Sequence, residues 1–351
     1  MDSNSKALDI LNTDERKLKE KADKARDASI GRDVFLRAII EISNLCEKNC
    51  FYCGIRRDNN LIKRYSMTEK EIAGLAKQAF DCGYYSIVLQ SGEITSPKFT
   101  SFIQSVVYKI KEITQGKMSV VLSLGEQNRK TYKLWKSAGA DRYLLRIETS
   151  SPRLYAQMHP NDKKHSIENR MECLYALKKL GYQLGTGILI GVPGQKTEDI
   201  ANDIDFFTEI DIDMLGMGPY IPTRNTPLYE KREAIDIKEN FFLALKTIAT
   251  CRILMPDINI ASTTALEAID PNGKIQGILW GANVIMPNIT PISQRADYKL
   301  YPYKPNETGL EKIYLEHLRL DLSKHNFNLK LTDKGDPLHY LLRYKTLSDK
   351  F

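Results

Sequence analysis

Short apolar segments rich in Val, Ile and Leu alternate along this chain with longer amphipathic segments, and this alternation constrains the fold more than any other feature. Segments of the first kind predict buried strands, and segments of the second kind predict helices. Strands that alternate with helices predict a parallel sheet. The eight candidate strands lie at residues 35–43, 85–91, 118–124, 142–148, 183–192, 214–221, 258–263 and 283–287.

Eight strands, each followed by a helix, predict an α/β fold with a closed (β/α)8 barrel of the TIM type. An open doubly wound sheet is the alternative, but no G-x-G-x-x-G motif follows any of the strands, which disfavours a Rossmann nucleotide site. The charged segment 14–30 predicts a leading helix. We therefore expect an N-terminal helical extension over 1–34, the barrel over 35–305, and a C-terminal helix with an irregular tail over 306–351.

Composition and charge exclude several classes of protein. Hydrophobic residues make up 42% of the chain and charged residues 27%, which is typical of a globular domain with a sizeable core. The net charge of +7 is spread along the sequence without a basic stripe interleaved with aromatic residues, so we expect no nucleic-acid partner. The N-terminus has no apolar signal segment, and no apolar run is long enough to span a membrane. We expect a soluble, cytoplasmic protein.

Three of the six cysteines, Cys46, Cys50 and Cys53, follow the first predicted strand directly, where the active site of a barrel is expected. Their C-x3-C-x2-C spacing holds three thiolates in one short loop, which suits a cuboidal iron–sulfur cluster with one iron left open. Structural zinc normally takes four protein ligands, and the five histidines all lie far downstream. Zinc with a distant fourth ligand and unligated thiols are the less favoured alternatives.

The cysteine motif, with Tyr52 directly before its last cysteine, resembles the cluster motif of the radical S-adenosylmethionine (SAM) superfamily. The resemblance implies that the three thiolates hold a 4Fe-4S cluster whose open iron binds SAM, and that reductive cleavage of SAM gives a 5′-deoxyadenosyl radical. The chain is most similar to the biotin-synthase-like branch. By that similarity the cofactor-binding residues are Tyr52, Gln90, Ser91, Gly92, Glu93, Glu148, Arg170, Met217 and Pro219.

Within this superfamily the chain resembles the HydE family of FeFe-hydrogenase maturases over roughly residues 35–302, through motifs that include CxxNCxYCGIRRDN, VLQSGE, GVPGQ and GANVIMPNITP. The resemblance implies a cysteine-bound iron carbonyl cyanide as substrate, and transient contacts with other maturation proteins and a reduced electron donor. It also implies that the residues lining the barrel interior near the substrate are Arg146, Thr263, Thr264, Met286, Tyr298 and Tyr301. An anionic metal complex would suit a cavity that holds one arginine, several hydroxyl groups and a thioether.

The sequence also departs from the family pattern. No cysteine follows Cys251, so we expect one cluster, and isoleucine replaces an acid at position 94 and a histidine at position 147. These changes leave the exact substrate open.

Three other functions are alternatives to this one. A biotin-synthase-like sulfur inserter needs cysteines on inner strands, and strands 118–124, 142–148 and 183–192 contain none. A methylornithine-synthase-like mutase acting on an amino acid would use the same barrel, and a zinc-binding or scaffold protein is the non-catalytic alternative.

Overall fold

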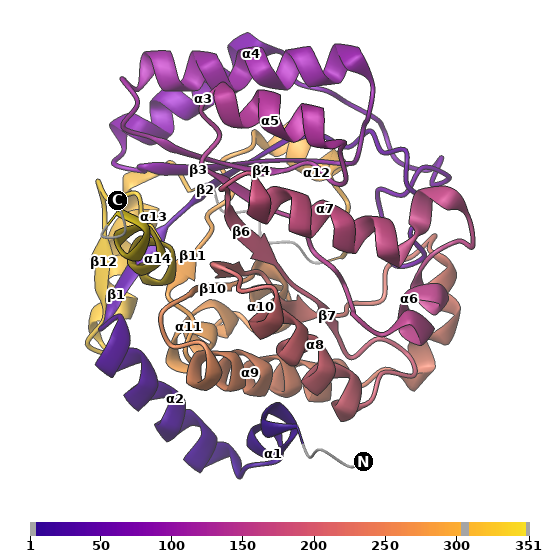
Figure 1. Cartoon of the computed structure of the whole chain (residues 1–351), viewed down its shortest axis with the longest axis vertical. Coiled ribbons are helices and arrows are strands. Elements are labelled where there is room, and N and C mark those ends of the chain that lie inside the picture. The colour runs from indigo at the N-terminus through magenta and orange to yellow at the C-terminus, as the bar shows by residue number, and fades with distance from the viewer. Residues whose placement is uncertain (1–4, 303–308, 349–351) are drawn as a thin grey trace.

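The computed structural model describes residues 5–302 and 309–348 of the chain. It confirms the predicted architecture of parallel strands surrounded by helices (Figure 1). The strands are β1 (Asp33–Leu36), β2 (Ala38–Ser43), β3 (Ser86–Ser91), β4 (Ser119–Ser123), β5 (Arg142–Leu144), β6 (Gln183–Thr186), β7 (Leu189–Ile190), β8 (Met214–Leu215), β9 (Gly218–Pro219), β10 (Asn259–Ser262), β11 (Val284–Ile285) and β12 (Asn328–Lys330).

The strand that runs from β1 to β2 joins the two ends of the strand series. Its first half, β1, pairs in parallel with β11, and its second half, β2, pairs in parallel with β3. Ile39 lies at the seam, because it is the register partner of Val88 on one side and of Asn288 on the other. The chain's first and last barrel strands are therefore hydrogen-bonded neighbours, as a barrel of the TIM type requires.

The expectation that 183–192 and 214–221 each form one strand is wrong. Each segment breaks into two short strands, β6 with β7 and β8 with β9, and the second members pair in a small sheet of their own. A Cβ atom on Gly187 would lie 2.1 Å from the carbonyl oxygen of Gly216, so the two backbones touch at the break. Glycine permits this close approach, which the apolar pattern alone does not reveal.

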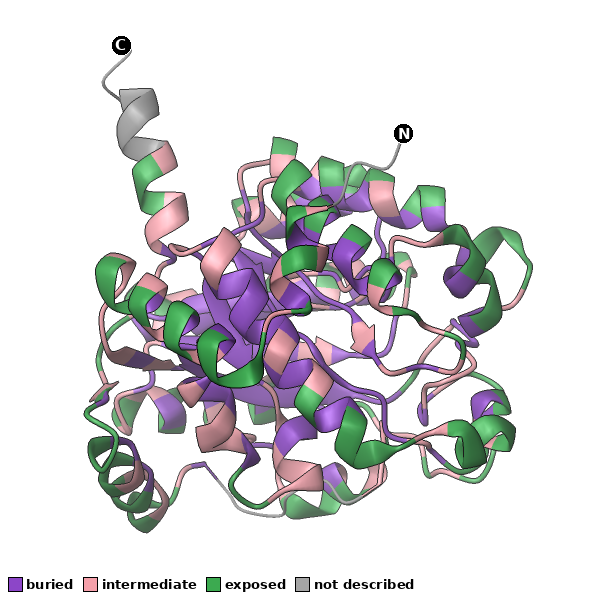
Figure 2. Cartoon of the chain, turned by 90° about the horizontal axis from the view of Figure 1, so that it is seen from below, coloured by how far each residue is buried: buried purple, intermediate pink, exposed green. Residues whose placement is uncertain are grey.

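Helices surround the strands. They are α1 (Lys6–Leu11), α2 (Glu15–Ser29), α3 (Glu69–Asp81), α4 (Pro97–Ile113), α5 (Arg129–Ser137), α6 (Pro152–Met158), α7 (Ile167–Lys179), α8 (Thr197–Glu209), α9 (Ile237–Leu254), α10 (Thr264–Ile269), α11 (Gly273–Leu279), α12 (Ile292–Asp297), α13 (Lys312–Ser323) and α14 (Leu338–Ser348), with 3-10 turns η1 (Lys163–His165) and η2 (Pro227–Ala234). The leading helix predicted over 14–30 is confirmed as α2. The strands and the inner helix faces are buried, and the outer helix faces are exposed (Figure 2).

The start of α3 shows how local sequence sets these helices. The Thr68 side chain accepts the backbone N–H of Glu71, and the Glu71 carboxylate accepts the backbone N–H of Thr68, which satisfies two N–H groups that a helix start leaves free. Ile72, Ala76 and Ala79 then recur on one face and are buried against the barrel.

The segment between β12 and α14 closes the N-terminal end of the barrel. The buried guanidinium of Arg142 donates to Ser86, to the carbonyl of Lys334 and to Asp336, the last at 2.7 Å. Asp336 also accepts from Gln183 at 2.6 Å. The sequence predicted only an irregular, polar tail here, and it missed β12. The predicted domain boundary between 305 and 306 lies outside the described residues.

A second charged cluster fixes α14 beneath the barrel. The His339 ring lies between two carboxylates, with Nδ1 3.0 Å from Asp257 and Nε2 hydrogen-bonded to Asp211, while Arg343 lies 2.6 Å from Asp213. The hydrogen bond with Asp257 raises the pKa of His339 above its usual value. Although burial opposes the effect, hydrogen bonds from Lys178 and His339 lower the pKa of Asp211 to about 2.

We expect the contribution of His339 to stability to decline as the pH rises. Because folding raises the pKa of this base, its stabilisation is complete below the unfolded value of about 6.5 and is lost as the pH rises through the folded value. At pH about 5.5, His339→Gln should lower the free energy of unfolding by about 1 kcal/mol, and the difference should shrink toward pH 9. Chemical denaturation at both pH values measures this, with the exposed His325→Gln as control. A pH-independent difference would contradict it.

Candidate active site

The three cysteines of the motif lie together in the loop that follows β2. Cys50 is buried, Cys46 and Cys53 are partly exposed, and all three thiols are free. Burial raises the pKa of each of them, to about 12 for Cys50. Each thiolate would also repel its neighbours, since Cys46 and Cys50 both act to raise the pKa of Cys53. Thiols in such surroundings ionise when a metal binds them, so the donor set fits a metal cluster.

The spacing of these thiols differs from that of a site for a single ion. Within residues 5–302 and 309–348, no three His, Cys, Asp or Glu side chains converge on one metal position. In a 4Fe-4S cluster each thiolate binds its own iron, so three cysteines on one cluster do not need to meet at a point.

Arg64 holds the cysteine loop in shape. Its guanidinium donates to backbone carbonyl groups on both sides of the motif, those of Asn44, Ile55, Arg56, Arg57 and Asn59. Gly54 packs directly on a second loop, since its backbone N–H donates to Leu300 at 3.1 Å and an added Cβ would lie 1.8 Å from the carbonyl oxygen of Lys299. Protein contacts on both sides of the motif therefore hold the loop.

The turn after β3 lies against the first cysteine. The Glu93 backbone N–H donates to the Cys46 sulfur at 3.4 Å. A Cβ on Gly92 would lie 2.2 Å from the Leu45 carbonyl oxygen, so only glycine fits this position. Ser91 caps the turn by donating to the Gly92 carbonyl, and Gln90 donates to the Tyr298 hydroxyl at 3.3 Å. The predicted cofactor residues 90–93 and the predicted cluster ligand are thus in direct contact.

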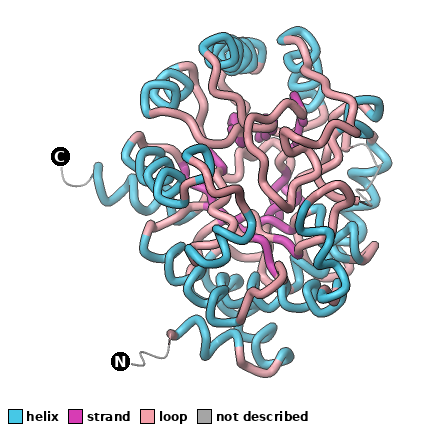
Figure 3. Tube along the Cα trace, turned by 90° about the vertical axis from the view of Figure 1, so that its right-hand side faces the viewer, coloured by secondary structure: helices cyan, strands magenta, loops and turns pink. Residues whose placement is uncertain are grey.

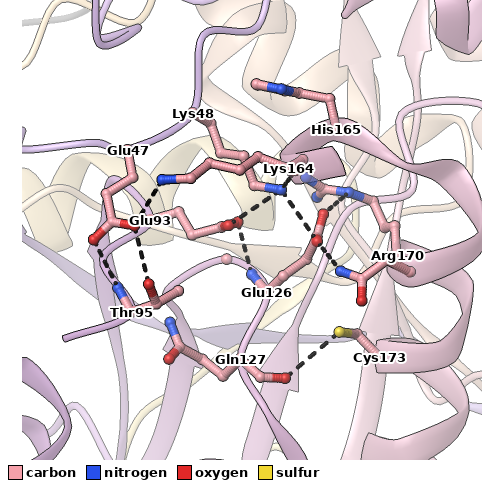
Figure 4. A network of polar contacts seen from close by, with 12 residues as sticks. Glu47, Lys48, Glu93, Thr95, Glu126, Gln127, Lys164, His165, Arg170 and Cys173 are labelled. Atoms are coloured by element: carbon pink, nitrogen blue, oxygen red, sulfur yellow. Dashed lines mark hydrogen bonds and ion pairs between the residues drawn. The ribbon is translucent and has the colours of Figure 1, made fainter. Parts of the chain in front are cut away.

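Four buried charged side chains lie beside this turn (Figure 4). Lys48, inside the cysteine motif, lies 3.3 Å from Glu93 and 3.1 Å from Glu126, and Arg170 on α7 lies 2.9 Å from Glu126. Burial raises the pKa of Glu93, whereas Glu126, against the effect of burial, raises the pKa of Arg170. Sequence reasoning missed Lys48. A lysine between two cysteine ligands, with acids ending the next two strands, is the signal that could have found it.

The segment from α6 to η1 covers the outer side of the cysteine loop. The backbone N–H groups of Phe51 and Asn49 donate to the Met158 carbonyl at 2.8 Å and to His165 Nε2 at 2.9 Å. The Tyr52 ring meets His159 edge to face at 5.5 Å between centroids. Tyr52 therefore packs against this cover. Loops of this kind surround the strand ends on the side of the molecule seen in Figure 3.

Glu148 has an unusual backbone. Its φ of +66° lies in the left-handed region, which is costly for a residue with a side chain and is common at functional sites. The Arg146 guanidinium lies 2.9 Å from the Glu148 carboxylate and donates to the Ile188 carbonyl at 2.7 Å. Glu148 is buried, while the Arg146 side chain is 29% exposed. Arg146 thus has a protein partner, and part of its surface is still accessible.

The other predicted interior residues occupy two places. Thr264 shares a hydrogen bond with Tyr301 at 2.5 Å, and Thr263 donates to the Met217 carbonyl at 2.9 Å, next to Pro219 of β9. Tyr298 is buried beside Gln90. Met286 lies apart from these polar groups, packed with a buried apolar group in the barrel interior that consists of Ile39, Val88, Val121 and Met214.

A cavity of about 580 Å³ lies elsewhere, between the α10–α11 connection and α13, lined by residues such as Lys274, Tyr314 and His317. It contains none of the predicted site residues. The contacts among the strand-end loops, rather than this cavity, define the candidate site.

Comparison with known proteins agrees with this geometry. Residues 40–207 match the family model of the radical SAM superfamily. The [FeFe] hydrogenase maturase subunit HydE of Thermotoga maritima is 48% identical over 283 residues, which cover 81% of this chain and 78% of the relative. The chain belongs to the HydE family of radical SAM enzymes. As a member of this family it is an enzyme that uses a 4Fe-4S cluster and SAM.

More distant relatives share the fold. The 3-methylornithine synthase of Methanosarcina acetivorans is 28% identical over 85% of this chain and 83% of its own length. Two solved structures superpose with a TM-score of 0.76, methylornithine synthase PylB at 23% identity over 93% of both chains, and the maturase HydG at 20% identity over 92% of this chain and 71% of its own. They confirm the predicted barrel. In the described residues, no helix combines the length and apolar character needed to cross a membrane.

Proposed function

We propose that this protein is a cytoplasmic radical SAM enzyme of FeFe-hydrogenase maturation, and that Cys46, Cys50 and Cys53 hold its single 4Fe-4S cluster. The observation that carries the proposal is the loop of three free thiols in contact with the Gly92 turn, in a chain 48% identical to a HydE maturase. When bound, the cluster and SAM supply a 5′-deoxyadenosyl radical by reductive cleavage of the sulfonium. The protein residues bind, orient and shield these groups.

Different residues around the cysteine loop would bind different parts of SAM. The turn at Gly92 and Glu93 offers backbone groups next to Cys46, and Arg170 offers a cation for the carboxylate of SAM. Glu148, whose left-handed backbone is typical of functional sites, would accept hydrogen bonds from the ribose hydroxyls. Tyr52, Met217 and Pro219 supply apolar surface for the remaining parts of SAM. Gln90 and Ser91 fix the turn itself.

The substrate we propose is a cysteine-bound iron carbonyl cyanide supplied by another maturation protein. Its negative charge would meet the exposed part of Arg146, and its ligands would meet the hydroxyl groups of Thr263, Thr264, Tyr298 and Tyr301. Met286, which packs with the apolar group of the barrel interior, would supply a thioether. The hydrogen bond between Thr264 and Tyr301 supports this grouping, because it joins two of the predicted substrate residues from different strand ends. A reduced electron donor completes the set of proposed partners.

A methylornithine-synthase-like mutase is the second candidate. The 28% identity to a 3-methylornithine synthase over 85% of this chain supports it. An amino-acid substrate would use Arg146 for its carboxylate. Incubation of the reduced protein and SAM with a panel of amino acids tests this candidate, since formation of methylornithine would displace the maturase proposal.

The reduced protein should cleave SAM to 5′-deoxyadenosine and methionine in equal amounts. Glu148→Ala should weaken SAM binding by about tenfold, because a charged hydrogen bond to the cofactor contributes about 1.5–3 kcal/mol. Product chromatography and equilibrium binding to anaerobically reconstituted protein measure both quantities. Glu198→Ala, an exposed acid on α8, is the control and should bind SAM normally. Unchanged affinity in Glu148→Ala would remove Glu148 from the site.

A further inference from the structure

Lys48 lies inside the cysteine motif, between Cys46 and Cys50, and forms ion pairs with Glu93 and Glu126. Its side chain is only 6% exposed, although lysine is almost never buried without a partner. We propose that Lys48 is a positioning residue, which balances two buried carboxylates and so leaves the charge of Arg170 available for the carboxylate of SAM. This inference rests on the proposed function.

The geometry that carries the inference is a chain of four alternating charges. Lys48 Nζ lies 3.3 Å from Glu93 and 3.1 Å from Glu126, and the Glu126 carboxylate also lies 2.9 Å from Arg170. The Glu126 backbone N–H donates to the second oxygen of Glu93 at 2.7 Å, which holds the two carboxylates side by side. The side chains are 5–9% exposed, so water screens these charges weakly (Figure 4).

The sum of these charges explains why the lysine is needed. With Lys48 present, two cations face two anions and the group is neutral. Without it, Arg170 alone would face two buried carboxylates, and the group would carry one net negative charge. A net negative group repels an incoming carboxylate and draws the guanidinium away from it, because interactions in a buried site are strong.

The surroundings of Lys48 fix its ammonium group in this position. The Lys48 ammonium also donates to the Lys164 carbonyl of η1, and its own carbonyl accepts the Arg57 N–H at 2.8 Å. The Glu47 N–H donates to the Glu93 carbonyl at 2.8 Å, so the cysteine loop and the β3 turn are joined by backbone as well. The loop that carries the cysteines thus also sets the charge around the SAM site.

Three variants test the charge balance, each compared with wild type by equilibrium binding of SAM to anaerobically reconstituted protein at pH 8. Lys48→Met makes the group net negative and should weaken binding by about tenfold or more. Glu93→Gln makes it net positive and should tighten binding by at least about twofold. The double variant Lys48→Met/Glu93→Gln is neutral again and should return to within about threefold of wild type.

Two further proteins complete the design. Lys48→Arg keeps the charge and should recover most of the affinity. Lys164→Met is the matched control and should behave as wild type, because the Lys164 side chain is 58% exposed. A second readout is the change that SAM causes in the paramagnetic signal of the reduced cluster, which should need a higher SAM concentration in Lys48→Met.

The directions of the changes in SAM affinity distinguish charge balance from a purely structural role. Weaker binding in both Lys48→Met and Glu93→Gln, or no recovery in the double variant, would mean that the four residues act only as a structural unit, and would overturn the inference. Normal binding by Lys48→Met would overturn it as well. If Lys48→Met does not fold, Glu93→Gln and the double variant still decide. A wild-type protein that takes up no cluster or binds no SAM would instead refute the proposed function.

Discussion

Cys50→Ala is expected to lose the cluster entirely. Wild-type protein reconstituted without oxygen should carry about four irons and four sulfides per chain, and the variant close to none, because a cluster held by three thiolates loses a third of its protein ligands. Cys46→Ala and Cys53→Ala should behave in the same way. Iron and sulfide analysis, together with the low-temperature paramagnetic signal of the reduced protein, measures the effect.

Cys82→Ala is the matched control for this experiment. Cys82 lies far from the motif, where its sulfur donates to the Leu310 carbonyl at 3.8 Å, so the variant should retain a full cluster. Stoichiometric zinc in place of iron would support the zinc-binding alternative and contradict the proposal. About eight irons in wild-type protein would contradict the expectation of a single cluster.

Arg146→Met is expected to lower activation of FeFe-hydrogenase in a maturation assay by about tenfold or more, since a buried charged contact is worth at least about 1.4 kcal/mol. The variant should keep its cluster, because the Arg146 guanidinium contacts Glu148 and the Ile188 carbonyl rather than a cysteine. SAM affinity should also fall, because the Glu148 carboxylate loses the cation 2.9 Å away. Arg146→Lys, which has a charge but no guanidinium fork, should recover part of the activity.

A double variant separates the two roles of this arginine. In Arg146→Met/Glu148→Gln both side chains are uncharged. If Arg146 acts only by balancing the charge of Glu148, its removal should then have no further effect. We expect SAM binding to recover in part and maturation to stay low. If SAM binding and maturation recover together, Arg146 acts through Glu148 alone. Arg146 would then give no support to an anionic substrate.

The strands and helices of this fold are predictable because they follow from local periodicity. The helix over 14–30 is α2, and each of the eight predicted strand regions contains a strand, although the strand predicted over 142–148 ends at Leu144. The breaks at Gly187 and Gly216 are not predictable in this way, since they depend on two strands that meet only in the folded barrel. The same holds for the closure by Asp336, which contacts Arg142 across 194 residues of chain.

The candidate site also combines residues that the sequence predicts with contacts that depend on the folded structure. The cysteines, the Gly92 turn and Glu148 stand out in the sequence as residue types at strand ends, and their roles remain predictions. The ion-pair partners of the charged residues cannot be identified in the sequence, because they depend on distances between side chains in the folded protein. Lys48 and Glu126 are 78 positions apart by number and 3.1 Å apart in space. Arg146 and Glu148 are only two positions apart, but both lie beyond the end of β5 and Glu148 has a left-handed backbone, so the alternation of side chains along a strand does not explain their pairing.

The attachment of the cysteine loop through Arg64 has a consequence for the life of the enzyme. Because one guanidinium already gathers five carbonyl groups from both sides of the motif, the loop does not need metal to acquire its shape. In proteins whose metal site forms only on binding, the affinity for metal is reduced by the cost of ordering the chain. The five hydrogen bonds of Arg64 contribute to the order of this loop independently of any bond to iron, so less of the free energy of cluster binding is spent on ordering the chain.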